Sequence, residues 1–138
     1  MKKILILIAF SGILFTSCKK DKTCDLNSTS LAGSYRVTSL KYKQTPTSAE
    51  VDLFSSLSAC QKDDIYVYNT NGTFNYQDAG VVCSPSGSYN STWTLSGNTL
   101  TFDGDVYNVN SFSCDGMGLT GNSIFVSGDV ATATFVRL

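Results

Sequence analysis

The chain of 138 residues contains no histidine and only two prolines, and Glu50 is its single glutamate. Histidine is the commonest general base and the commonest metal ligand, so its absence argues against an activated serine or cysteine nucleophile and against zinc. No Cys-x-x-Cys spacing is present either. We therefore expect a protein that is not an enzyme, with no catalytic residue, no cofactor and no metal.

Basic residues are also scarce, because ten Lys and Arg stand against eleven Asp and Glu. Apart from two lysines at the N-terminus, the one basic cluster is Lys19, Lys20 and Lys22. Nucleic-acid binding needs a basic patch that neutralises phosphates. We expect no nucleic-acid partner.

No apolar run reaches the roughly 20 residues that a membrane-spanning helix needs. The longest, residues 4–15, follows two lysines and precedes Thr16-Ser17-Cys18, which is the order of a secretory signal peptide. Leu14-Phe15-Thr16-Ser17-Cys18 resembles a bacterial lipobox. That resemblance implies that Cys18 carries a diacylglycerol thioether and palmitate-type chains, enough for stable anchoring. The alternative is an ordinary signal peptide that ends near a cysteine.

The residues around Cys18 also carry expectations about location and domains. Lys19 follows Cys18 in place of Asp, and no acidic run follows. By the sorting rule known for bacterial lipoproteins, this implies the outer membrane, facing the periplasm. We divide the chain into a signal peptide at 1–17, a lipidated linker at 18–30 and one domain at 31–138, expected to be monomeric.

Alternating apolar and polar residues between turn signals predict an all-β domain. The clearest segment is 89–106, where Gly97-Asn98 fits a two-residue hairpin turn. A turn there opposes Leu95 with Leu100, Trp93 with Phe102, and Tyr89 with Val106. One face of this hairpin is then apolar and the other polar, as a half-buried antiparallel pair requires.

Two further turns predict registers of their own. A turn at Gly128-Asp129 opposes Ile124 with Ala133 and Val126 with Ala131. Around residues 69–72, a four-residue loop opposes Ile65 with Tyr76 and Val67 with Phe74, whereas a two-residue loop opposes Cys60 with Cys83. Apolar pairing favours the four-residue loop.

Four cysteines follow Cys18, and an even number in an exported chain favours two disulfides, with three possible pairings. In either register of the 69–72 hairpin, Cys60 and Cys83 fall on one face within disulfide reach. We therefore pair Cys60 with Cys83 and, by elimination, Cys24 with Cys114.

One helix is expected among the strands. Thr47-Ser48-Ala49-Glu50 matches a capping box, and apolar residues then recur at helical spacing, which predicts a helix over 48–58. Strands are expected near 33–43, 62–69, 73–80, 87–96, 99–104, 105–113, 116–121, 122–127 and 130–138. About eight antiparallel strands indicate an up-and-down barrel or a sandwich, and the absence of exposed edges favours the barrel.

The chain resembles the lipocalin-like domain of lipoproteins of the Bacteroidota type. The resemblance rests on Leu31-Ala32-Gly33-Ser34-Tyr35, Asp63-Asp64-Ile65-Tyr66-Val67-Tyr68, Asn71-Gly72-Thr73-Phe74, Trp93-Thr94-Leu95 and the last six residues. In lipocalins the first strand carries Gly-x-Trp, and this Trp packs against an Arg near the last strand. Tyr35 and Arg137 stand in those places and are expected to close the barrel through a cation–π contact.

The resemblance also implies a small hydrophobic or amphipathic ligand inside the barrel. The candidate ligand-binding residues are Phe54, Tyr76, Tyr89, Trp93 and Phe102, and the 48–58 helix would either cover the mouth or plug the core. The alternative is a filled barrel that acts on an envelope protein through an exposed aromatic patch of Tyr66, Tyr68 and Tyr107.

Overall fold

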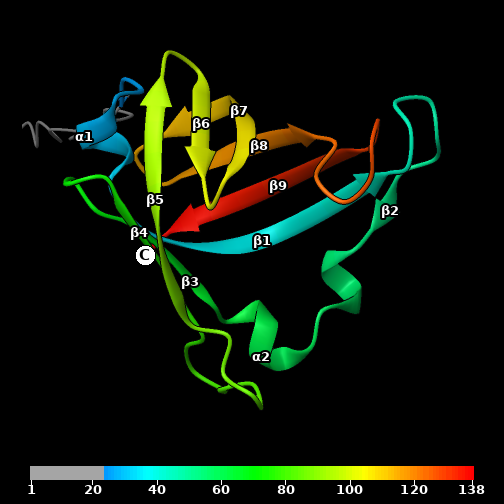
Figure 1. The fold of residues 1–138 in the computed structure, drawn as a ribbon, viewed down its shortest axis with the longest axis horizontal. Helices are drawn as coiled ribbons and strands as arrows, with labels where there is room; N and C mark the ends of the chain where they lie inside the picture. Colours follow the sequence, from blue (N-terminus) through cyan, green and yellow to red (C-terminus); the bar gives the residue numbers. More distant parts are fainter. Residues whose placement is uncertain (1–23) are drawn as a thin grey trace, which may run out of the picture.

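The computed structural model of the protein describes residues 24–138, and Figure 1 shows their arrangement. Strands make up most of this range. In chain order the elements are α1 (Ser28–Leu31), β1 (Gly33–Lys43), β2 (Val51–Asp52), a 3-10 turn (Phe54–Ser56), α2 (Ala59–Lys62), β3 (Ile65–Tyr68), β4 (Thr73–Gln77), β5 (Tyr89–Ser96), β6 (Thr99–Phe102), β7 (Asp105–Ser113), β8 (Gly116–Asn122) and β9 (Val130–Arg137).

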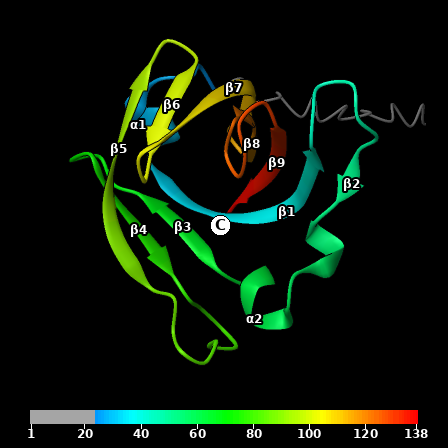
Figure 2. The same ribbon diagram turned by 45° about the vertical axis from the view of Figure 1, so that its right-hand side comes forward.

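Eight of the strands form a closed antiparallel barrel. Each of β3 to β8 pairs with the next strand along the chain, and β1 pairs with both β3 and β9. The pairing of β1 with β9 runs from Tyr35↔Arg137 to Lys43↔Val130, so it closes the ring along nearly the whole length of both strands. The predicted up-and-down barrel is confirmed. Figure 2 shows the strands curving around a common interior, with β2 outside the ring beside β1.

The β5–β6 hairpin has the predicted register at its turn and departs from it further away. Leu95 opposes Leu100 and Trp93 opposes Phe102. The expected pair of Tyr89 with Val106 is wrong, because the chain turns again at Asp103 and Gly104, whose φ angles are 55° and 88°. Two successive residues with positive φ are typical of the type I′ turns that join short hairpins.

The β3–β4 hairpin lies one residue away from both registers that the sequence offered. Tyr66 opposes Tyr76 and Tyr68 opposes Phe74, around a loop in which Gly72 has a φ of +84°. A three-residue loop that ends in a left-handed glycine is a common hairpin connection. A shift of one residue exchanges the two faces of a strand. Tyr66 and Tyr68 therefore face inward, so the predicted exposed aromatic patch is wrong.

The predicted strand at 122–127 is a loop. β8 ends at Asn122, and its Leu119 opposes Ala133, so the expected pairings of Ile124 and Val126 across a Gly128-Asp129 turn are wrong. The loop of residues 123–129, called the 123–129 loop below, folds around the carboxylate of Asp129. That carboxylate accepts hydrogen bonds from the amides of Ile124 (2.8 Å), Phe125 (2.9 Å) and Val126 (2.8 Å).

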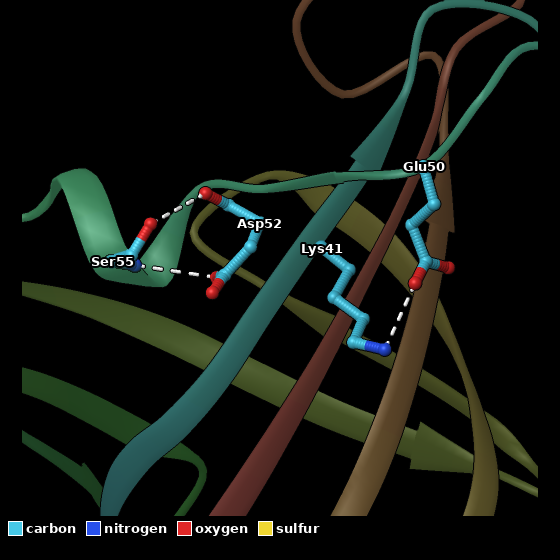
Figure 3. Close-up of polar contacts among 4 residues, drawn as sticks. All are labelled: Lys41, Glu50, Asp52 and Ser55. Atoms are coloured by element: carbon cyan, nitrogen blue, oxygen red, sulfur yellow. Dashed lines mark hydrogen bonds and ion pairs between the residues drawn. The ribbon is translucent and has the colours of Figure 1, made fainter.

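The predicted helix over 48–58 is also wrong. Figure 3 shows that Glu50 reaches across to Lys41 on β1, with 2.9 Å between Oε1 and Nζ, and does not turn back to cap a helix. Asp52 follows in β2 and caps only the 3-10 turn, where its Oδ1 accepts from the Ser55 amide. The helix forms later, at α2, where Ser58 and Gln61 make the reciprocal capping box.

Both expected disulfides are present. Cys60–Cys83 joins α2 to the loop between β4 and β5, so these residues are not cross-strand neighbours as the hairpin argument assumed. Cys24–Cys114 joins the segment before α1 to the turn between β7 and β8. Residues 24–30, predicted as linker, therefore pack with the barrel. No helix in the described range is long and apolar enough to cross a membrane.

Candidate functional site

The barrel has two ends, and one of them is filled. We call the end under α1 the base; there Leu31, Tyr35 and Phe74 are completely buried and Tyr68 is 1% exposed. Tyr68 packs edge-on against Trp93 with 5.6 Å between ring centroids. The interior at this end is packed with side chains, so a ligand has no room there.

Arg137 holds α1 across the base. Its guanidinium donates to the backbone carbonyls of Ser30 (Nη1 to O, 2.8 Å) and Ala32, and its Cζ lies 5.5 Å from the centroid of the Tyr35 ring. A Cβ at Gly33 would come within 2.6 Å of Arg137 Nη2, so glycine makes room for the guanidinium. The expected cation–π contact between Tyr35 and Arg137 is present where β1 and β9 meet.

The opposite end contains a cavity of about 360 Å³, which we call the mouth cavity. This volume falls within the range of pockets that hold small molecules. Most of its lining is apolar or aromatic and comes from the barrel strands, α2 and the 123–129 loop. The lining side chains belong to Val37, Leu40, Leu57, Gln61, Tyr66, Tyr76, Tyr89, Phe102, Asp103, Asp105, Tyr107, Leu119, Ile124, Phe125, Ala131, Ala133 and Phe135.

Five aromatic rings make up the wall of the mouth cavity on the β3–β7 side. Tyr76 stacks on Tyr89 at 5.2 Å and Phe102 stacks on Tyr107 at 4.6 Å, measured between ring centroids. Tyr66 meets Tyr76 edge-on at 5.2 Å. Such stacked and edge-on pairs stabilise each other beyond their buried area, so the wall is preorganised.

Carboxylates hold the hydroxyl groups of these tyrosines. Tyr89 donates to Asp103 (Oη to Oδ2, 2.7 Å), and Tyr107 lies at the limit of a hydrogen bond to Asp105 (3.5 Å). Tyr76 donates to Asp64, which is only 2% exposed. Polar groups thus occur at a few points of a wall that is otherwise apolar, an arrangement typical of ligand pockets.

The tyrosines of the mouth cavity remain neutral at physiological pH. Burial, with the Asp64 charge as a second cause, raises the pKa of Tyr66 to about 12. Burial also raises the pKa of Tyr76, Tyr89 and Tyr107, followed by the hydrogen bonds and charges of the neighbouring carboxylates. The four phenols are therefore available as protonated hydrogen-bonding groups.

The 123–129 loop forms part of the rim. Phe125 lines the mouth cavity but is 59% exposed, and it packs edge-on against Tyr42 with 5.6 Å between ring centroids. Figure 1 shows this loop on the side of the barrel away from α1. The rim of the mouth cavity therefore presents an exposed aromatic ring to solvent.

Three of the five predicted ligand-binding residues line the mouth cavity: Tyr76, Tyr89 and Phe102. Trp93 does not line it, because it is 4% exposed in the packed base and its Nε1 donates to the Asn69 carbonyl at 2.8 Å. Phe54 does not line it either and lies under the ammonium of Lys62, 5.5 Å from Nζ to the ring centroid.

Sequence reasoning missed Tyr66 and Tyr107 as lining residues. The inward position of Tyr66 depends on the β3–β4 register, and the left-handed Gly72 after Asn69-Thr70-Asn71 was the signal for it. Leu57, expected in a helix, reaches the cavity from the segment just before α2.

Within residues 24–138, no group of three or more His, Cys, Asp or Glu side chains could hold a metal ion. Asp103 and Asp105 flank a tight turn and hold tyrosine hydroxyls. Cys18 and the predicted signal peptide lie outside the described residues.

Comparison with known proteins agrees with this architecture. No curated protein matches the chain. A family model described as a lipocalin-like domain matches residues 31–123, which is more than half of the chain. The match begins at Leu31, the last residue of α1, and includes β1 to β8. The closed eight-stranded barrel agrees with this match, and the chain belongs to the lipocalin-like domain family.

Proposed function

We propose that the protein binds a small hydrophobic or amphipathic molecule in the mouth cavity and is a binding protein, not an enzyme. The observation that carries this proposal is the contrast between a filled base and a cavity of about 360 Å³ lined by aromatic and aliphatic side chains. Burial of apolar ligand surface would contribute roughly 25 cal/mol per Å². The exposed Phe125 supports access from solvent.

Native mass spectrometry of the gently purified protein tests the proposal. We expect a small-molecule adduct that disappears on denaturation, on a protein with both disulfides formed. The substitution Ala133→Phe is expected to remove the adduct, because Ala133 lines the cavity opposite Leu119 and a ring there would occupy the space.

The control is Ala49→Phe, which adds the same ring at an exposed position of the loop between β1 and β2. That variant should keep the adduct. An adduct that survives Ala133→Phe would contradict the proposal. A wild-type protein that carries no adduct and binds no apolar probe at millimolar concentration would contradict it as well.

We also propose that the protein is anchored through acyl chains on Cys18 to the outer membrane, facing the periplasm. The order of lysines, apolar run and Ser17-Cys18-Lys19 supports this proposal. Metabolic labelling with palmitate should label the wild type and not Cys18→Ser. Fractionation should find the labelled protein in the outer membrane, and protease added to intact cells should leave it uncut; recovery as an unlabelled soluble protein would contradict the anchor.

A further inference from the structure

The mouth cavity contains acidic groups but no basic one. Asp103 and Asp105 are its charged lining residues, and no lysine or arginine of the described chain lines it. Arg137 is at the opposite end, where its guanidinium is bonded to carbonyls of the α1 segment. A bound carboxylate or phosphate would therefore have no cationic partner here, and hydrogen bonds to charged groups are the strong ones.

A third carboxylate stands behind the aromatic wall. Asp64 is 2% exposed, and one of its oxygens accepts from Tyr76, while Oδ1 has no hydrogen-bond partner among the described residues. A buried carboxylate oxygen that lacks a hydrogen-bond partner is unfavourable. Its charge acts on the rings of Tyr66 and Tyr76, both of which line the cavity. Asp64 does not itself line the cavity, so its effect on a bound cation would act through the tyrosine wall.

The aromatic wall itself suits a cation. A positive group within about 6 Å of a ring centroid is attracted by the negative face of the ring, and clusters of such rings recognise ammonium ligands. Tyr66, Tyr76, Tyr89, Phe102 and Tyr107 supply rings from five strands, β3 to β7. The carboxylates already hydrogen-bond the hydroxyls of three of these tyrosines, so ring and charge lie together.

Building on the proposed binding function, we propose that the mouth cavity selects organic cations, with an apolar or aromatic body among the rings and an ammonium group near Asp103 and Asp105. The apolar wall binds the body of any amphiphile. The acidic groups then determine which head group is accepted.

Isothermal titration calorimetry of the full protein with octylamine, octanol and octanoate at pH 7 tests this inference. The three probes share one chain and differ in head-group charge. We expect octylamine to bind about tenfold more tightly than octanoate, with octanol between them. The difference should shrink at high salt, because Asp103 and Asp105 are exposed and their field is screened.

The double variant Asp103→Asn/Asp105→Asn identifies the source of the preference. Asp103 adopts a φ of 55° before Gly104, and Asn-Gly is the favoured pair in such a turn, so the hairpin should fold. The ratio of octylamine affinity to octanol affinity should fall to about one in this variant, whatever the change in octanol affinity itself. The control is Asp115→Asn, an exposed carboxylate in the β7–β8 turn at the base, which should leave all three affinities as they are.

The outcomes separate the two proposals. Equal affinity for the three probes would overturn cation selection and leave the binding function standing. The same would follow if Asp115→Asn lost as much octylamine affinity as the Asp103→Asn/Asp105→Asn variant. Binding of none of the probes would overturn both. A tenfold octylamine preference that disappears only in the Asp103→Asn/Asp105→Asn variant would support both.

Discussion

The base and the mouth of the barrel are built from the same strands but differ in how far their aromatic side chains are buried. At the base, Tyr35 and Phe74 are fully buried, and a buried tyrosine hydroxyl is bonded to the backbone, from Tyr35 Oη to the Leu31 carbonyl at 2.7 Å. At the mouth, Tyr89 is 41% exposed and its hydroxyl bonds a solvent-exposed carboxylate. One end therefore buries its aromatic rings in the core of the fold, whereas the other presents aromatic surface to solvent.

Truncation of a ring should affect the two ends very differently. Phe74→Ala at the base is expected to lower the free energy of unfolding by about 3–5 kcal/mol, because it removes a fully buried ring and leaves a cavity. Phe125→Ala at the mouth should lower it by about 0.5 kcal/mol or less, since that ring is 59% exposed. Urea unfolding followed by circular dichroism measures both. Similar losses for the two variants would contradict the division.

Each end of the barrel has one disulfide, so removing the disulfides one at a time tests the same difference between the two ends. Each should contribute about 2–4 kcal/mol. Cys24–Cys114 at the base spans 90 residues and Cys60–Cys83 at the mouth spans 23. Loop entropy then makes removal of the base disulfide more destabilising by about 1 kcal/mol. The urea midpoints of the two double Cys→Ala variants show which disulfide contributes more to stability. A larger loss on removal of Cys60–Cys83 would show that the mouth is the more constrained end.

The attachment of α1 to the base depends on the shape of one guanidinium. Arg137→Lys should cost about 1.5–3 kcal/mol, because a lysine ammonium cannot reproduce the forked donation to the Ser30 and Ala32 carbonyls. Arg36→Lys, the matched control, changes the other arginine of the chain, which lies one residue from Tyr35 on β1. It should cost less than about 1 kcal/mol. Thermal unfolding measured by calorimetry compares the stability of the two variants. An equal loss of stability in both would argue against a specific role for the two hydrogen bonds from the Arg137 guanidinium.

The eight strands of the barrel and the closing contact could be predicted from the sequence, whereas the lining of the cavity could be predicted only in part. Alternation around Gly97-Asn98 fixes Trp93 opposite Phe102 because a shift would bury threonines. The Tyr66 strand offers no such discrimination. Ile65, Tyr66, Val67 and Tyr68 are all acceptable inside, so the register depends on the loop around Gly72.

The two errors of element type share a physical cause. Local signals at Thr47–Glu50 and at Gly128-Asp129 were real polar motifs, but their carboxylates bond partners other than those that the predicted elements require. Glu50 pairs with Lys41 across strands, and Asp129 binds amides that precede it in the chain. Such short motifs identify a carboxylate that accepts hydrogen bonds but not the element around it, because several donors near the carboxylate compete for it.

The smallest expected effect concerns pH and the rim of the mouth. Burial raises the pKa of Asp129. Hydrogen bonds from the amides of Val126, Phe125 and Ile124 lower it, and together they outweigh burial, so the pKa of Asp129 lies below the ordinary value. A depressed folded-state pKa stabilises the loop above about pH 3.9, the unfolded value, and this stabilisation is lost as the pH falls through the folded pKa. We therefore expect the amide resonances of residues 124–126 to change below about pH 4 while those of β1 stay constant.

The loop between β4 and β5 provides the comparison within the mouth, since Asp78 accepts from the Cys83 amide at 3.0 Å in the same way but the Cys60–Cys83 disulfide also holds that loop. Acid should open the 123–129 loop first; simultaneous opening of both would mean that the disulfide adds nothing at this end and that the mouth responds to pH as one unit.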